Sequence, residues 1–121
     1  MNPLRDAYLL PGVNDQKRDI AEYVGEILRV LGDEILAAQQ SGQTQLDTNI
    51  PHTFMVTNMS VQRARESIWA DVIAKLRERH YRVAISHGRD FCRLRIKWIT
   101  EEEEYAIDRQ RAILREHYAE F

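Results

Sequence analysis

Residues that could carry out chemistry gather around Gly88. They are His87, Asp90 and Cys92, and His80 lies a few positions earlier. Imidazole, carboxylate and thiolate groups are common zinc ligands, and a cysteine beside a histidine can act as a nucleophile. Both chemistries require the side chains to converge on one point in space. Spacing along the chain does not by itself produce that convergence.

We interpret this group of residues as structural. Cys92 begins an alternating apolar pattern of the kind that a half-buried β-strand shows, which makes it a small core side chain. Asp90 and Gly88 are residue types that turns favour. Because the chain has a single cysteine, it cannot form an internal disulfide or a zinc site of several cysteines. We therefore predict no catalytic residue, no metal site and no cofactor.

Other catalytic motifs are missing from the sequence. The five glycines are scattered, so no phosphate-binding loop is formed, and neither HExxH nor GxSxG occurs. The run Glu101–Glu104 could be taken for a cation site, but consecutive residues fan out around a helix. At most Glu101 and Glu104 share a face, and the run suits the first turn of a helix, where the dipole favours negative charge. We expect a protein that is not an enzyme.

The strongest concentration of one charge lies in residues 82–99, which read as a β-hairpin. Alternation places one set of side chains toward a core, namely Val83, Ile85, Cys92, Leu94, Ile96 and Trp98. The opposite face and the turn are basic and form a candidate surface for a protein partner or a nucleic acid: Arg82, Arg89, Arg93, Arg95 and Lys97. The nearby aromatic residues Tyr81, Phe91 and Trp98 are interpreted as core or edge packing.

Three amphipathic segments predict helices. Apolar residues repeat at helical spacing in residues 15–40 and 59–79, the second capped by Asn58 or Ser60 and basic on its outer face. Thr100 and Glu103 form a capping box that begins the last helix. Its apolar stripe is thin, so we expect it to lie at the periphery or to complete its burial against a partner.

The remaining segments connect these helices. Residues 39–51 are polar and predict a loop, and residues 52–57 predict a short strand. The resulting fold class is α+β, with three main helices and a small mixed sheet built on a β-hairpin, in the order α-β-α-β-β-α. Residues 14–121 form a single domain, and residues 1–13 form an extended, apolar arm.

The net charge of −2 disfavours a general nucleic-acid binder, but the charge is unevenly distributed. Residues 1–59 and 98–121 each have a net charge of −4, whereas residues 60–97 have a net charge of +6. Acidic helices could compensate a basic sheet within the chain, or the basic segment could bind a partner. No apolar run approaches the length of a membrane span, no signal peptide is evident, and the cysteine content favours the cytoplasm or a host-cell interior.

Two functions follow as hypotheses. The first is a non-enzymatic interaction or structural subunit that self-associates or packs into a larger protein assembly, such as a virion, secretion or regulatory complex. The second is a nucleic-acid-binding accessory protein that uses the basic hairpin 82–99 and the basic face of helix 59–79. Candidate contacts between subunits are Tyr8, Leu9 and Leu10 of the arm, the shared face of Gly25 and Gly32, and the acidic residues Glu101 and Glu104.

Overall fold

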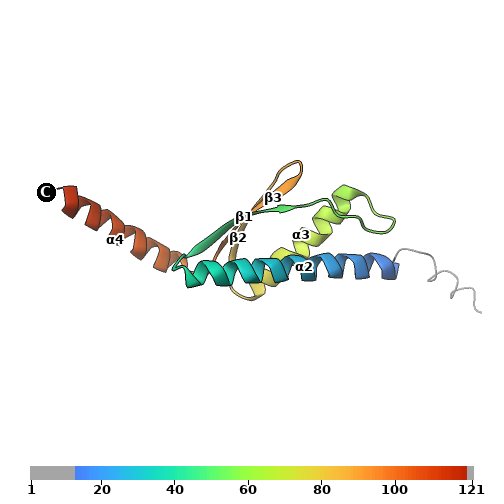
Figure 1. Ribbon diagram of the computed structural model, residues 1–121, viewed down its shortest axis with the longest axis horizontal. Coiled ribbons are helices and arrows are strands. Elements are labelled where there is room, and N and C mark those ends of the chain that lie inside the picture. The colour runs from blue at the N-terminus through green and yellow to red at the C-terminus, as the bar shows by residue number, and fades with distance from the viewer. Residues whose placement is uncertain (1–12, 120–121) are drawn as a thin grey trace, which may run out of the picture.

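The computed structural model describes residues 13–119, which form three helices and three strands in the predicted order α-β-α-β-β-α (Figure 1). The elements are α2 (Val13–Gln40), β1 (Gln45–Pro51), α3 (Val61–Glu78), β2 (Arg82–His87), β3 (Phe91–Lys97) and α4 (Glu101–Ala119). The α+β class is therefore confirmed. The arm residues Tyr8, Leu9 and Leu10 lie outside the described residues.

The three strands form one sheet in the order β1-β3-β2, and both pairings are antiparallel. The prediction of a mixed sheet was wrong. The α3 crossover brings β2 back in the same direction as β1, but β3 lies between the two strands. Each outer strand therefore pairs only with β3, and the parallel strands never meet.

The position of β1 also differs from the prediction. The strand covers Gln45–Pro51, within the stretch predicted to be a loop, and ends before residues 52–57, which were predicted to be the strand. Leu46 and Ile50 face the core while Asp47 and Asn49 face outward. Only two apolar residues mark this alternation, so the sequence pattern is weak. Pairing with β3 stabilises this polar sequence as a strand, which is a tertiary effect that intrinsic β-propensity does not include.

Helices α2 and α3 cover one face of the sheet and enclose a single core (Figure 1). The inward residues of β3, Cys92, Leu94 and Ile96, are fully buried, as predicted. Trp98 only packs against this core and is partly exposed. The fully buried side chains with the largest volumes are Trp69, Leu31, Ile68, Leu94, Ile96, His52, Val72 and Cys92.

The segment after β1 is fastened to the start of α2 by polar contacts. The Asp19 carboxylate accepts hydrogen bonds from the Thr57 backbone N–H at 3.0 Å and from the Thr57 hydroxyl at 2.9 Å. These bonds hold the pKa of Asp19 below its ordinary value. The backbone N–H of Met55 donates to the Tyr23 hydroxyl at 3.1 Å. Together they fasten Met55 and Thr57 to α2.

Local capping sets the starts of α3 and α4. The Ser60 hydroxyl accepts from the Arg63 backbone N–H, which selects Ser60 as the cap of α3. At α4 the Thr100 hydroxyl accepts from the Glu103 N–H at 3.1 Å, and the Glu103 carboxylate accepts from the Thr100 N–H at 3.4 Å. The predicted capping box is confirmed. No helix in residues 13–119 combines the length and apolar character that crossing a bilayer requires.

Candidate functional site

The basic surface predicted for the hairpin lies on the face of the sheet that no helix covers. We call this the outer face; its basic members are Arg82, Arg93, Arg95 and Lys97. They occupy this face because their neighbours along β2 and β3 point into the core. The predicted alternation is therefore correct, although Arg82 and Lys97 are only partly exposed.

Most of this charge is neutralised within the chain. Arg95 Nε donates to Asp47 Oδ1 of β1 at 2.7 Å, and Lys97 Nζ donates to Glu104 Oε1 of α4 at 2.5 Å. Arg82 reaches Glu104 at 2.8 Å and Glu101 at 3.6 Å. Acidic residues from both ends of the chain thus compensate the basic middle.

The ion pairs also lower the pKa values of the acids that take part. The pKa of Glu104 falls below its ordinary value, first because Lys97 and then because Arg82 donates to it. The hydrogen bond from Arg95 lowers the pKa of Asp47 in the same way. Both carboxylates are therefore ionised at neutral pH and remain paired with the sheet.

Two arginines of the surface remain available for a partner. Arg93 and Arg89 are exposed, and neither forms an ion pair within residues 13–119. Phe91 lies on the same outer face as Arg93 and is 53% exposed. Its interpretation as core or edge packing was wrong, because alternation along β3 places Phe91 on the outer face while its neighbour Cys92 enters the core. A shallow hollow lined by Asn49, Ser86, Gly88, Phe91 and Arg93 lies beside it.

The basic face of α3 does not join this surface. The buried side of α3, including Ile68 and Val72, packs on the inner face of the sheet. The exposed side of α3 therefore points away from the sheet, on the side opposite the outer face. Lys75 is also paired with Asp71 at 3.1 Å. Arg65 is an exception, because its guanidinium donates to the Arg89 carbonyl at the hairpin turn at 3.3 Å. The rest of the basic side of α3 is therefore separated from the outer face by the sheet.

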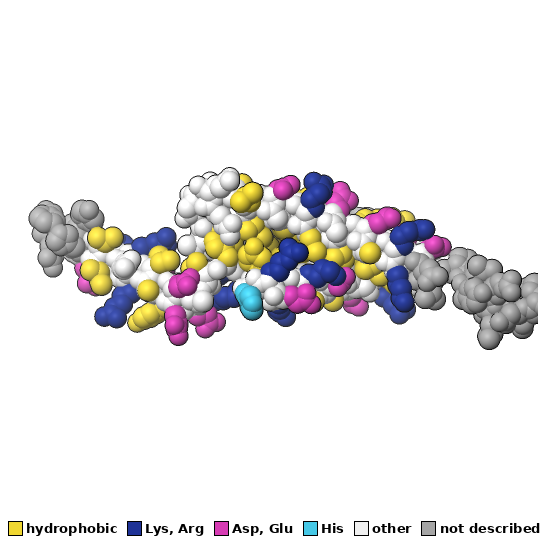
Figure 2. Space-filling view, turned by 90° about the horizontal axis from the view of Figure 1, so that it is seen from below, with side chains coloured by type: hydrophobic (Ala, Val, Ile, Leu, Met, Phe, Trp, Pro, Cys, Tyr) yellow, Lys and Arg dark blue, Asp and Glu magenta, His cyan; other side chains and the backbone are white. Residues whose placement is uncertain are grey.

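Three of the exposed large apolar residues are on α4, and Leu36 of α2 is also 54% exposed. Helix α4 projects from the end of the body beyond the last turn of α2 (Figure 1). Tyr105 is 68% exposed, and Ile113 and Leu114 are each 54% exposed. Figure 2 shows hydrophobic side chains among charged ones on this projecting helix. Along residues 101–116 only Glu104 and Ile107 are partly buried.

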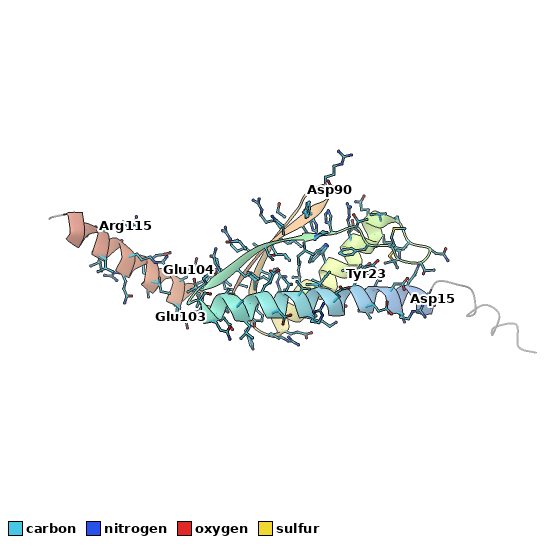
Figure 3. All side chains as sticks on the ribbon, in the orientation of Figure 1. Asp15, Tyr23, Asp90, Glu103, Glu104 and Arg115 are labelled. Carbon is cyan, nitrogen blue, oxygen red and sulfur yellow. The ribbon has the colours of Figure 1, made fainter. Side chains whose placement is uncertain are left out.

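Contacts at its first turn attach α4 to the body. Glu104 lies where the helix leaves the sheet, whereas Arg115 lies far out along it (Figure 3). The Glu104 carboxylate accepts hydrogen bonds from both Lys97 and Arg82. Beyond this turn Ile107 is partly buried, and the other side chains up to residue 116 are exposed.

The predicted subunit contacts have different positions in the structure. Glu101 and Glu104 face the hairpin of their own chain, so their predicted contact with a neighbour's hairpin would compete with these pairs. Gly25 and Gly32 lie on the exposed side of α2, where a Cβ added to either glycine would meet no atom within 4 Å among the described residues. This small-residue face is open, and its role in association stays a prediction.

The structure assembles a histidine–cysteine cluster that the sequence interpretation divided. Ligand atoms of His52, His87 and Cys92 all lie within 4.8 Å of one another. His87 and Cys92 are directly opposite each other on β2 and β3, and His52 directly follows β1. Asp90 and His80 are not members of the cluster. Reasoning from sequence missed His52 because it is separated from His87 by the whole crossover.

The cluster does not have the properties of a cysteine nucleophile. Cys92 is fully buried, and burial raises the pKa of its thiol to about 11. The thiol sulfur lies 3.8 Å from His87 Nδ1, a weak contact. A nucleophilic cysteine requires a lowered pKa and access to substrate. The geometry therefore gives no support to a thiol-based reaction.

Comparisons of the chain with protein-family models, curated proteins and solved structures gave no match.

Proposed function

We propose that this chain is a non-enzymatic interaction subunit, and that α4 joins it to a second copy of itself. The observation that supports the proposal is the exposed apolar face of α4 on a helix that buries little in its own body. Most helices in proteins obtain their stability from packing an amphipathic face, and isolated helices are marginal in water. Pairing would supply the packing that the monomer lacks.

The charges of α4 favour an antiparallel pair. Residues 101–108 contain five acidic and no basic side chains, whereas residues 109–116 contain three arginines and one glutamate. In an antiparallel dimer the acidic half of each helix lies beside the basic half of its partner. Such an interface is self-complementary under a two-fold axis. A parallel pair would instead place acid against acid.

The apolar residues fit the same arrangement. Ile107 and Leu114 are two helical turns apart and share a face. With the two-fold axis between residues 110 and 111, Ile107 of one helix lies beside Leu114 of the other. Ala106 and Ile113 widen the contact on one side. Tyr105 lies on the opposite side of the helix and is not part of this interface.

Light scattering at several concentrations tests the proposal with a matched pair of variants. Leu114→Ser should weaken self-association, because it removes the central apolar contact. Tyr105→Ser removes an even more exposed side chain from the other face and should leave association unchanged. A wild-type chain that stays monomeric at high concentration would refute the proposal.

The apolar arm is proposed to add to the same assembly. Deletion of residues 1–12, which removes Tyr8, Leu9 and Leu10, should lower the mass of the assembly or its thermal stability. An assembly of unchanged size and melting temperature would show that these residues do not contribute.

Nucleic-acid binding is the second candidate, and exposed Phe91 beside Arg93 supports it. Single-strand binders combine a stacking aromatic side chain with positive charge. The ion pairs of Arg95, Lys97 and Arg82 oppose it, because they remove most of the charge that phosphates would require. We therefore rank it below association.

A salt-dependent mobility-shift assay separates the two candidates. We expect no binding of DNA or RNA by the wild-type chain. If binding is observed, changing Arg93, Arg95 and Lys97 together to Ser should reduce the salt slope by about one unit per lost phosphate contact. Tight, salt-sensitive binding by the wild-type chain would reverse the ranking of the two functions.

A further inference from the structure

Three potential metal ligands lie at the same end of the inner face of the sheet. Cys92 is on β3, His87 is opposite it on β2, and His52 directly follows β1. This end holds the hairpin turn, where Figure 3 labels Asp90, and it is distant from the start of α4. The three side chains come from segments far apart in sequence, and the fold alone brings them together.

His52 provides an independent observation. Its side chain is 1% exposed, and its Nδ1 atom is buried without a hydrogen-bond partner among the described residues. Its Nε2 atom lies 3.1 Å from the Arg89 carbonyl oxygen, which can only accept. In the neutral ring Nε2 therefore carries the proton, and Nδ1 presents a lone pair that nothing satisfies.

This arrangement is characteristic of histidines that bind metals. A ligating imidazole usually donates its other N–H to a carbonyl or carboxylate, which fixes the tautomer and orients the ring. The Arg89 carbonyl occupies that position for His52. Trp69 Nε1 is the other buried nitrogen without a partner among the described residues, but an indole N–H only donates and cannot bind a cation.

The separation of the Cys92 and His87 ligand atoms fits a tetrahedral site. Two ligands of one zinc ion, a thiolate and an imidazole, are separated by about 3.6 Å when the metal–ligand bonds are about 2.3 and 2.0 Å. Cys92 Sγ and His87 Nδ1 are 3.8 Å apart, and all three ligand atoms lie within 4.8 Å. His87 is exposed, so its ring can move toward the other two ligands without disturbing the core.

One nearby charge opposes a bound cation. The Arg65 guanidinium donates to the backbone carbonyl of His52 at 2.8 Å and to that of Arg89 at 3.3 Å. The negative charge of a Cys92 thiolate would offset it, and one thiolate with two imidazoles is a ligand set that suits zinc and excludes magnesium and calcium.

We propose that His52, His87 and Cys92 form a binding site for a zinc-class transition-metal ion, with a fourth position open to solvent on the exposed side of His87. The ion would link the ends of all three strands. This proposal does not depend on the association of α4, because the two sites lie at opposite ends of the sheet.

Titration of the full chain with Co²⁺ tests the site directly. Tetrahedral cobalt gives visible d–d bands, and a thiolate ligand adds a charge-transfer band. We expect one equivalent to bind with both signatures and to be displaced by Zn²⁺. Absence of both signatures in the wild-type chain would refute the proposal.

Two histidine variants test whether the bound Co²⁺ occupies the proposed site. His87→Ala removes an exposed ligand without changing the core and should weaken binding by more than about tenfold, since even loss of a supporting partner costs that much. His80→Asn is the control: His80 lies outside the cluster, and asparagine tolerates its positive φ of 67°. It should bind as the wild type does. Unchanged binding by His87→Ala would show that the ion is held elsewhere.

A second readout covers variants that fold poorly. Cys92→Ser should eliminate the charge-transfer band, but Cys92 is fully buried and the change can destabilise the core. The thermal shift produced by Zn²⁺ is therefore compared between the wild type and His87→Ala. A ligand that binds only the folded state raises the melting temperature. We expect a rise in the wild type alone, and an equal rise in both proteins would contradict the site.

Discussion

The helices of the body, α2 and α3, and the projecting helix α4 are stabilised by different forces. In α2 and α3 one side of each helix is buried in a shared core, with Leu31 and Ile68 completely inaccessible. In α4 nothing described beyond the first turns is buried, and its start depends on the Thr100 capping box and acidic residues at the positive end of the helix dipole. Helix content alone therefore does not define the cooperative unit, because tertiary burial links α2 and α3 whereas mainly local interactions stabilise α4.

The largest expected effect is in the core. Ile96→Ala truncates a fully buried side chain on the central strand of the sheet and should lower the free energy of unfolding by about 2–5 kcal/mol. Leu114→Ser in α4 should change the monomer by less than about 0.5 kcal/mol, as expected for exposed positions. Chemical denaturation at low protein concentration measures both. Equal losses would mean that α4 belongs to the cooperative core.

Two helix caps give a sharper comparison. Ser60→Ala and Thr100→Ala each remove a hydroxyl that accepts a backbone N–H, which is worth about 1 kcal/mol to the helix. At α3 the loss should appear in global unfolding, because α3 is part of the core. At α4 it should appear as faster amide exchange in residues 101–116 with little change in global stability. If Thr100→Ala lowered global stability as much as Ser60→Ala, the separation of the two regions would be wrong.

Acid should loosen the junction between the regions. The pKa of Glu104 is lower in the folded chain than its ordinary value of 4.5, so its contribution is fully present above that value and is lost as the pH falls through the folded pKa. The wild type should therefore lose stability below about pH 4.5. On acidification the Glu104→Gln variant should lose less stability than the control variant Glu102→Gln, which changes an exposed neighbour. Identical acid profiles for these two variants would show that Glu104 does not hold the junction.

The smallest effect is expected on the outer face. Arg95→Ala breaks the ion pair with Asp47, but the two side chains are 55% and 48% exposed. Exposed pairs of this kind contribute at most about 1 kcal/mol, and often nothing measurable. Thermal melting should place this variant within a degree or two of the wild type in the monomer. A large destabilisation would mean that the pair fixes the register of β1 on β3.

The sequence predicted the features that depend on local patterns. Alternation predicted that Leu94 and Ile96 are buried, and capping preferences predicted the start of α4 at Thr100. It could not locate β1, because Gln45–Pro51 becomes a strand through pairing with β3 and contains several turn-favouring residues. The spacing between His87 and Cys92 was visible, whereas the third member, His52, depends on the path of the crossover.

The strand order has a consequence for how the chain folds. Because β3 lies between β1 and β2, the pairing of Gln45 with Lys97 joins positions 52 residues apart, whereas the hairpin is local. Closing the longer loop costs more entropy and is slower. During synthesis β1 emerges early and then has no backbone partner until the last strand has been made. The β2–β3 hairpin should form first and recruit β1 afterwards, so pulse-labelled amides of β1 should become protected after those of β2. Simultaneous protection of both strands would exclude this order.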